Sequence, residues 1–282
     1  MLVSLIVATR GRDQDVAVLL DSLLAQQHAA LEVIIVDQNT DDRLGPIVAG
    51  YAPRLAVRRL RSSVANANHA RNLGLAQAGG LLVGFPDDDC EFLPGVLARV
   101  VAAFGEDALL QVLTGPAASP EGGLGSGRWR EQGGAITLEN VWTSVIEFNL
   151  FLRRETAQAL RGFDEALGPG TRFGSAEGND LVARAIRAGH RAVYDSGLRI
   201  IHPDKRLTEV AVARARLYGT GLGLVLRRHA PGMRTWLPFF VRPLGGVVLS
   251  ALKLRRLELA YYAATLRGRL AGWFATDPGA PT

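Results

Sequence analysis

Short apolar runs alternate with amphipathic stretches over the first part of the chain. Continuous apolar runs are typical of strands buried on both faces, whereas apolar residues spaced three and four apart are typical of helices. Strands are predicted over Val3–Ala8, Leu31–Val36, Leu55–Leu60, Leu81–Phe85 and Leu109–Thr114, and helices over Asp13–Gln27, Asp42–Tyr51, Asn66–Gln77 and Leu93–Phe104. This alternation predicts an α/β fold with a mostly parallel central sheet and helices on both faces.

The pattern is less regular after residue 115. Glycine-rich loops are predicted over Pro116–Gly134, which we expect to be mobile, and over Gly168–Gly178. Further elements are a strand over Asn140–Arg153, helices over Glu155–Arg161 and Asn179–Ala188, and strands near Ala192–Tyr194 and Leu198–Ile201. Helix dominates from Lys205 onward. We therefore expect an α/β domain over residues 1–204 and a helical C-terminal region over residues 205–282.

Composition excludes several classes of protein. Of the 282 residues, 48% are hydrophobic, which is too many for a disordered chain. The single cysteine, Cys90, cannot form an internal disulfide, so a reducing cytoplasm suits the chain. The N-terminus is apolar for only about seven residues and lacks a basic region before them, which indicates a buried strand and not a signal peptide.

Charge is distributed unevenly between the two regions. Residues 1–204 carry a net charge of −5 and residues 205–282 a net charge of +10. A basic segment of this kind implies an anionic partner surface. Nucleic acid is not expected to be that partner, because the segment lacks zinc-ligand spacing, an aromatic RNA-binding motif and a helix-turn-helix.

Large apolar residues alternate with the basic ones in the C-terminal region. This composition is typical of a segment that lies on an anionic bilayer. The run Trp236–Leu252 contains Pro238, Arg242 and Pro243, and a spanning helix needs about 20 apolar residues without such interruptions. We therefore expect a peripheral membrane contact. The alternative is that these apolar residues pack against the rest of the chain.

Polar residues follow directly after the predicted strands. Ligands of open α/β sheets bind at the carboxyl ends of the strands. Those ends carry Thr9-Arg10, Asp37-Gln38-Asn39, Asp87-Asp88-Asp89 and His202. Three consecutive carboxylates repel one another, and a divalent cation such as Mn²⁺ or Mg²⁺ removes the conflict. The alternative is a solvated turn that caps the next helix.

Several nucleotide-binding and catalytic motifs are missing. The turn after the first strand, Thr9-Arg10-Gly11-Arg12-Asp13, has no G-x-G-x-x-G pattern, so NAD and FAD are not expected. There is also no P-loop and no G-x-S-x-G nucleophile elbow. Arg71, on the helix before the acidic strand, is placed to meet a phosphate, or else is an ordinary surface arginine.

The order of these motifs resembles the inverting family 2 glycosyltransferases, which have the GT-A fold. The resemblance rests on Thr9-Arg10, Asp37, Asn68-x-x-Arg71-Asn72-x-Gly74-Leu75 and Asp87-Asp88-Asp89, and continues through Arg161-Gly162-Phe163-Asp164-Glu165, Glu177-x-x-Asp180-Leu181-x-x-Arg184 and His202. It covers roughly residues 1–204. It implies a nucleotide-sugar donor, a divalent metal and single-displacement transfer with inversion.

The resemblance also implies roles for individual residues. Thr9, Arg10, Asp37 and Asn39 would line the nucleoside pocket, with Asp87 and Asp88 beside it and Arg71 near the donor. Asp89 would ligate the metal that bridges the diphosphate, with His202 as a further ligand. Basic amphipathic appendages are common in relatives that act on lipid-linked acceptors, which favours a cytoplasmic enzyme on the inner face of the membrane, active in polysaccharide or glycolipid synthesis.

The catalytic base is the point where this chain departs from the pattern. The family often has adjacent Glu and Asp, with the Asp as base, whereas here Glu177 is followed by Gly178 and the next carboxylate is Asp180. We favour Glu177, because a long side chain in a flexible glycine-rich turn can reach an acceptor. Asp180 is the second candidate, and its alternative role is to cap or organise the helix.

Two other functions compete with a glycosyltransferase that uses a UDP- or dTDP-sugar and a sugar or lipid-linked acceptor. A sugar-phosphate nucleotidylyltransferase would carry a glycine-rich loop with lysine after the first strand, and this chain has no lysine before Lys205. A non-catalytic nucleotide-sugar-binding module would bind the donor without turnover.

Overall fold

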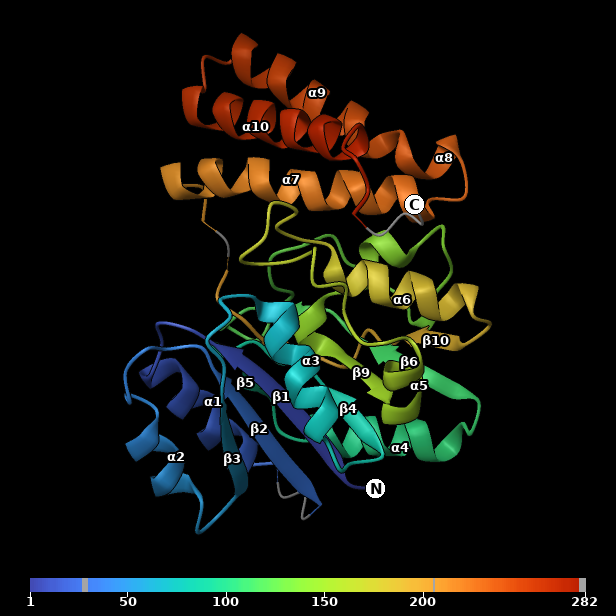
Figure 1. Cartoon of the computed structure of the whole chain (residues 1–282). Helices are drawn as coiled ribbons and strands as arrows, with labels where there is room; N and C mark the ends of the chain where they lie inside the picture. Colours follow the sequence, from blue (N-terminus) through green and yellow to red (C-terminus); the bar gives the residue numbers. More distant parts are fainter. Residues whose placement is uncertain (27–29, 205, 279–282) are drawn as a thin grey trace.

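The computed structural model describes residues 1–26, 30–204 and 206–278, so the predicted helix end at Gln27 and the region boundary at Lys205 lie outside the described residues. An eight-stranded sheet forms the centre of the α/β part (Figure 1). Its strands, in spatial order, are β3 (Ala56–Arg61), β2 (Leu31–Asp37), β1 (Val3–Thr9), β4 (Leu82–Gly84), β9 (Leu150–Arg153), β6 (Leu110–Thr114), β10 (Arg191–Tyr194) and β8 (Gly134–Ala135).

One strand in the body of this sheet, β9, runs opposite to its neighbours, as does the edge strand β8 beside β10. Strands β3, β2, β1 and β4 are parallel to one another, as are β6 and β10, while β9 runs antiparallel between β4 and β6. The register pairs Thr9 with Asp37, so the polar ends of β1 and β2 meet at the same edge of the sheet. The predicted α/β class with a mostly parallel centre is confirmed.

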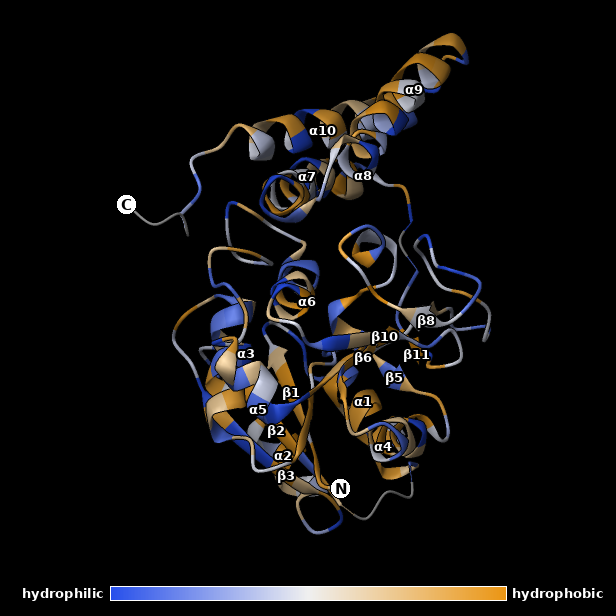
Figure 2. Ribbon diagram, turned by 90° about the vertical axis from the view of Figure 1, so that its right-hand side faces the viewer, coloured by the Kyte–Doolittle hydropathy of each residue, from blue (hydrophilic) through white to orange (hydrophobic). Residues whose placement is uncertain are grey.

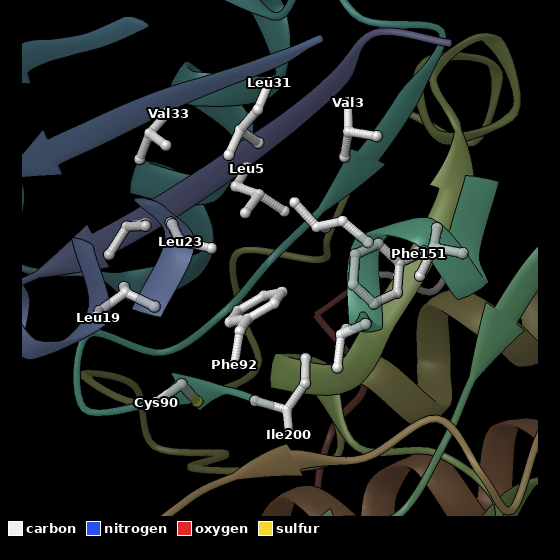
Figure 3. Close-up of a cluster of buried hydrophobic side chains, with 14 of the residues drawn as sticks. Val3, Leu5, Leu19, Leu23, Leu31, Val33, Cys90, Phe92, Phe151 and Ile200 are labelled. Carbon is white, nitrogen blue, oxygen red and sulfur yellow. The ribbon is translucent and has the colours of Figure 1, made fainter. Parts of the chain in front are cut away.

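Helices cover both faces of the sheet. One face packs on α1 (Gln14–Leu24), α2 (Gly45–Tyr51) and α4 (Val96–Glu106), and the other on α3 (Ala67–Gln77), α5 (Arg154–Ala159) and α6 (Glu177–Arg187). Figure 3 shows the first core, where Leu5 of β1 lies near Leu23 of α1 and Phe151 of β9. Successive β1 residues serve opposite cores, since Leu5 belongs to the first and Ile6 to the second.

A small second sheet carries one side of the site. Its order is β5 (Glu91–Phe92), β11 (Ile200–Ile201) and β7 (Ala117–Ala118). Strand β11 is shorter than the predicted Leu198–Ile201, and β7 lies inside the predicted loop Pro116–Gly134. This sheet brings His202, directly after β11, towards the residues between β4 and β5.

The prediction of a strand over Asn140–Arg153 is wrong for its first ten residues. They form two 3₁₀ turns, η1 (Val141–Thr143) and η2 (Glu147–Asn149), and only β9 is extended. Local polar groups explain the turns: the Asn140 side chain accepts from the Thr137 backbone N–H, and Ser144 Oγ donates to the Asn140 carbonyl. The turns place Glu147 at the site described below.

The C-terminal region is helical, as predicted. It comprises α7 (Glu209–His229), α8 (Met233–Trp236), α9 (Pro238–Leu252) and α10 (Arg256–Trp273). Helices α7 and α10 lie side by side (Figure 1). They pack backbone to backbone, because a Cβ added at Gly272 would lie 1.9 Å from the Thr220 carbonyl oxygen.

Helix α7 also packs on the α/β part. Leu224 and Val225 join a buried cluster with Leu167, Phe173 and Ala176, which precede α6. The Ser175 hydroxyl donates a 2.6 Å hydrogen bond to the Tyr218 carbonyl. One face of α7 therefore packs against the α/β part, and another face packs against α10.

Candidate functional site

The ends of β1 and β2 form a rigid polar frame. Asp37 is completely buried, and its Oδ1 accepts hydrogen bonds of 2.8 Å from both the backbone and the side-chain N–H of Asn39. Asn39 Oδ1 in turn accepts from the Gly11 backbone N–H at 2.6 Å. Thr9 is buried at the end of β1 and Arg10, next to it, is exposed. The structure thus brings together four of the residues predicted to line a nucleoside pocket.

Asp87, Asp89 and His202 converge between β4 and β11. One ligand atom from each lies within 4.8 Å of the others. His202 Nε2 lies 3.4 Å from Asp89 Oδ1 and 3.9 Å from Asp87 Oδ2. The prediction that Asp89 and His202 approach each other is confirmed, but its reason, a shared sheet edge, is wrong, because β4 and β11 belong to different sheets and the small sheet carries His202 to the end of β4.

The donor atoms of this cluster fit a divalent cation. His202 Nδ1 lies 2.9 Å from the Pro203 carbonyl oxygen, and since a carbonyl can only accept, Nδ1 donates to it and Nε2 is the ring nitrogen that faces the carboxylates and could ligate a cation. Asp89 Oδ1 is buried and makes no hydrogen bond among the described residues. Two carboxylates and an imidazole suit Mn²⁺. Phe148 stacks on the His202 ring at 4.6 Å and fixes its plane.

Arg12 is a residue of this site that the sequence analysis left without a role. Its Nη1 lies 2.5 Å from Asp88 Oδ1 and 2.6 Å from Asp89 Oδ2. Burial raises the pKa of the Asp88 carboxyl, and the Arg12 charge opposes that rise in part. The only sequence signal was its place in the turn after the first strand.

Arg71 is buried at the centre of a charge network. Its guanidinium donates to Asp87 Oδ1 at 2.9 Å, to Asn68 Oδ1 at 2.9 Å and to Glu177 Oε1 at 3.3 Å. Its side chain is 3% exposed. Arg71 therefore links the candidate metal ligand Asp87 to the acidic start of α6, and is not the surface arginine of the alternative interpretation.

Glu177 does not lie in a flexible loop as the sequence suggested. It is the first residue of α6 and is 1% exposed. Burial, followed by the negative charge of Glu147, raises the pKa of Glu177 to about 8, although Arg71 lowers it. Its Oε2 is buried without a hydrogen bond among the described residues. The expectation that Glu177 lies in a flexible turn, from which its side chain reaches out towards an acceptor, is therefore wrong about the turn.

Asp180 is held by cations on both oxygens. Arg184 Nε donates to Oδ2 at 2.8 Å, and His229 Nε2 lies 2.9 Å from Oδ1. Burial alone would raise the pKa of Asp180, but the hydrogen bond from His229 and the charge of Arg184 together lower it. Arg228 Nη1 also approaches Oδ1, at 3.4 Å. Asp180 joins α6 to α7, which matches the organising role considered as its alternative.

Glu147 is a second residue that the sequence analysis missed. It lies in η2, next to Phe148, and is half-buried. Its carboxylate acts on Glu177, Arg71 and Tyr218, whose pKa values all respond to it. The sequence placed it inside a predicted strand, where no motif distinguished it.

Sheet, acidic strand ends and metal-type cluster together define a nucleotide-sugar-binding GT-A domain. The family profile of "Glycosyl transferase family 2" matches residues 4–164, more than half of the chain. The chain belongs to glycosyl transferase family 2, and the class predicted from the sequence is confirmed.

Two curated relatives carry glycosyltransferase names. The chain is 37% identical over 89 residues to the uncharacterized glycosyltransferase EpsJ of Bacillus subtilis (strain 168), a match of 31% of this chain and 26% of EpsJ. It is 33% identical over 107 residues to the uncharacterized glycosyltransferase YibD of Escherichia coli (strain K12), a match of 38% of this chain and 31% of YibD. The matches thus span between a quarter and a third of each relative's length.

Solved structures share the fold along nearly the whole chain. The mannosyltransferase PcManGT of Pyrobaculum calidifontis, in complex with GDP-Man and Mn²⁺, superposes with a TM-score of 0.70 at 17% identity over 96% of this chain and 87% of its own. S. aureus TarS residues 1–349, in complex with UDP-GlcNAc, superpose with a TM-score of 0.63 at 19% identity over 98% of this chain and 94% of that one. At these identities the likeness shows the fold alone.

Proposed function

We propose that this chain transfers a sugar from a nucleoside-diphosphate sugar to an acceptor hydroxyl, with a divalent metal and with inversion at the anomeric carbon. The observation that carries the proposal is the convergence of Asp87, Asp89 and His202 beside the polar frame of β1 and β2. PcManGT holds GDP-Man with Mn²⁺ and TarS holds UDP-GlcNAc, which supports a nucleotide sugar as donor. The predicted donor is a UDP- or dTDP-sugar.

Different residues of the chain are proposed to bind the nucleoside and the diphosphate of the donor. Thr9, Arg10, Asp37 and Asn39 border the nucleoside, with Asp87 and Asp88 next to it. Asp89 and His202 would hold Mn²⁺ or Mg²⁺, which when bound stabilises negative charge on the leaving diphosphate. Arg71 keeps the Asp87 carboxylate in place through its 2.9 Å hydrogen bond.

Inversion requires a base opposite the diphosphate, since the acceptor oxygen attacks in line with the leaving group. The carboxylates at the start of α6 lie on the far side of Arg71 from Asp87. Both oxygens of Asp180 are occupied by Arg184, Arg228 and His229. We therefore propose that the base that takes the proton of the acceptor hydroxyl lies in the group of carboxylates around Glu177.

The donor assay tests this function directly. Purified protein is screened with UDP-, dTDP- and GDP-sugars in the presence of Mn²⁺, by thermal shift and by release of nucleotide, with water as a slow acceptor. We expect one donor class to raise the melting temperature only when Mn²⁺ is present, and to be hydrolysed slowly. Binding without any release, also in the presence of cell-membrane extract as a source of acceptor, would indicate the non-catalytic binding module. Equal binding with a chelator present would contradict the metal role.

The acceptor side is proposed to face a membrane. Residues 233–252 have a mean hydropathy of 1.4 with only 11% of the stretch buried, and so pass a length and composition test for a membrane span. Figure 2 shows α9 projecting from the body, with hydrophobic residues along much of its ribbon. Its exposed side chains include Val241, Leu244, Val248, Leu249 and Leu252.

Charge and exposure favour a helix that lies on the surface of an anionic bilayer. Pro243 and the exposed Arg242 interrupt the apolar run, and Lys253, Arg255 and Arg256 follow it. Trp236 and Phe240 pack on Trp273, and Phe239 packs on Trp142, but all three remain only partly buried, so this packing covers the aromatic face only in part. We propose a peripheral site on the inner face of the cell membrane, with a sugar or lipid-linked acceptor of polysaccharide or glycolipid synthesis.

Binding to vesicles tests the membrane contact. The protein is expected to co-sediment with vesicles that contain phosphatidylglycerol, and to do so less as salt rises, because salt screens its basic residues. The double variant Leu244→Glu/Val248→Glu should lose most of the binding, since both side chains are about half exposed. The control Val18→Glu, an exposed position on α1, should bind like the wild type. Equal sedimentation of all three proteins would contradict the proposal.

A further inference from the structure

Glu147 lies between the cluster of Asp87, Asp89 and His202 and the start of α6. Its neighbour Phe148 stacks on His202, with the two rings 4.6 Å apart and nearly parallel. On its other side, the Glu147 backbone and Cβ lie against Gly178, the second residue of α6. Two independent contacts thus fix the position of this acidic residue relative to the candidate metal ligand and to Glu177.

Gly178 is what allows this approach. A Cβ at position 178 would lie 3.3 Å from both the backbone N and the Cβ of Glu147, and 3.4 Å from its Cα. Such distances are tighter than ordinary van der Waals contact, so any larger residue would push η2 away from α6. The absence of a side chain after Glu177 therefore makes room for a carboxylate that comes from a different part of the chain.

The charges of the two glutamates act on each other. After burial, Glu147 is the largest contributor to the raised pKa of Glu177, and its charge also acts on buried Arg71. Burial raises the pKa of Tyr218 of α7, and the charges of Glu147, Glu177 and Asp87 add to the rise. The three carboxylates therefore act on the same residue of α7.

Exposure separates the two glutamates. Glu177 is 1% exposed and is held by Arg71, whereas Glu147 is half-buried, so part of this residue is in contact with solvent. An acceptor hydroxyl in solvent can therefore reach Glu147 more readily than Glu177.

We propose that Glu147 is the general base of the transfer and that Glu177, which is buried and bonded to Arg71, is not. The inference rests on the proposed function and names the residue of that site which touches the acceptor. Glu147 takes the proton of the acceptor hydroxyl as the acceptor oxygen forms its bond to the anomeric carbon. The bond from that carbon to the diphosphate oxygen breaks, and its electron pair leaves with the nucleoside diphosphate.

The test compares Glu147→Gln with the wild type, using the donor that the screen identifies, Mn²⁺ and water as acceptor. Turnover at saturating donor should fall at least about 100-fold, which is the usual effect of removing a general base. The affinity for the nucleotide with Mn²⁺ should stay within about threefold, since the change removes an interaction of the transition state. The matched control is Glu106→Gln, an exposed position at the end of α4, which should behave like the wild type.

A second variant separates chemistry from folding. Glu147→Ala should be inactive and should recover part of its turnover in sodium formate, because a small carboxylate can occupy the vacated space. Glu177→Gln should retain more turnover than Glu147→Gln. Near-normal turnover of Glu147→Gln, or a loss of nucleotide binding in parallel with turnover, would overturn the assignment but not the proposed function. A wild-type protein that binds no nucleotide with Mn²⁺ would overturn the proposed function, and this assignment with it.

Discussion

Asp89→Asn is expected to abolish metal-dependent nucleotide binding while the chain stays folded. Asp89 Oδ1 is buried beside His202 Nε2 and makes no hydrogen bond within the described part of the chain, which suits the bound cation of the proposal. An amide is a weaker ligand than a carboxylate, and loss of one of the proposed ligands should lower Mn²⁺-dependent affinity by about 100-fold. Calorimetric titration of nucleotide with Mn²⁺ measures this directly.

Two comparisons make the Asp89 result specific. Asp21→Asn, an exposed position on α1, should leave the affinity unchanged. The thermal midpoint of Asp89→Asn in the absence of metal should change little, because relief of repulsion among three consecutive carboxylates offsets the loss of the ion pair with Arg12. If nucleotide binds Asp89→Asn and the wild type equally well with Mn²⁺, the cluster of Asp87, Asp89 and His202 is not the metal site.

Asp180→Ala is expected to lower the free energy of unfolding by about 3–5 kcal/mol, the usual cost of removing one partner from a buried ion pair. Asp180 is 2% exposed, and its removal would leave Arg184, Arg228 and His229 without their shared anion. The loss should appear as a lower midpoint in urea. The joint between α6 and α7 would loosen, because this carboxylate holds both helices.

The same variant distinguishes a structural from a catalytic role. At a temperature where it remains folded, Asp180→Ala should keep most of its donor hydrolysis per molecule. Asp41→Ala, which removes the exposed partner of Arg43, serves as the control and should change stability little. If Asp180→Asn is as stable as the wild type but inactive with donor binding retained, Asp180 is a catalytic group and the assignment to Glu147 fails.

The error about Glu177 has a simple physical origin. Glycine-rich surroundings suggested a flexible turn, but α6 begins one residue earlier than Gly178, and Gly178 serves close packing against Glu147. A glycine requires either conformational freedom or close approach, and local sequence does not distinguish the two. Arg71 was similarly ambiguous. Its side chain is only 3% exposed and contacts two carboxylates, and both properties depend on segments far away in the chain.

The sequence by itself determined the α/β alternation and the residues at the strand ends. These properties follow from hydrophobic period and from the rule that parallel strands end at a common edge. The approach of Asp89 to His202 was expected at one sheet edge, but it depends on the small second sheet, which the sequence pattern did not indicate. Only the tertiary structure decided which residues approach that edge from elsewhere. The contacts of Arg12 with Asp89, of Glu147 with Gly178 and of Asp180 with His229 of α7 join residues that lie far apart in the sequence. No periodic pattern in the sequence indicates such partners. Local pattern sets the elements and their ends, whereas packing sets which charges face one another, because burial and pairing depend on the whole fold.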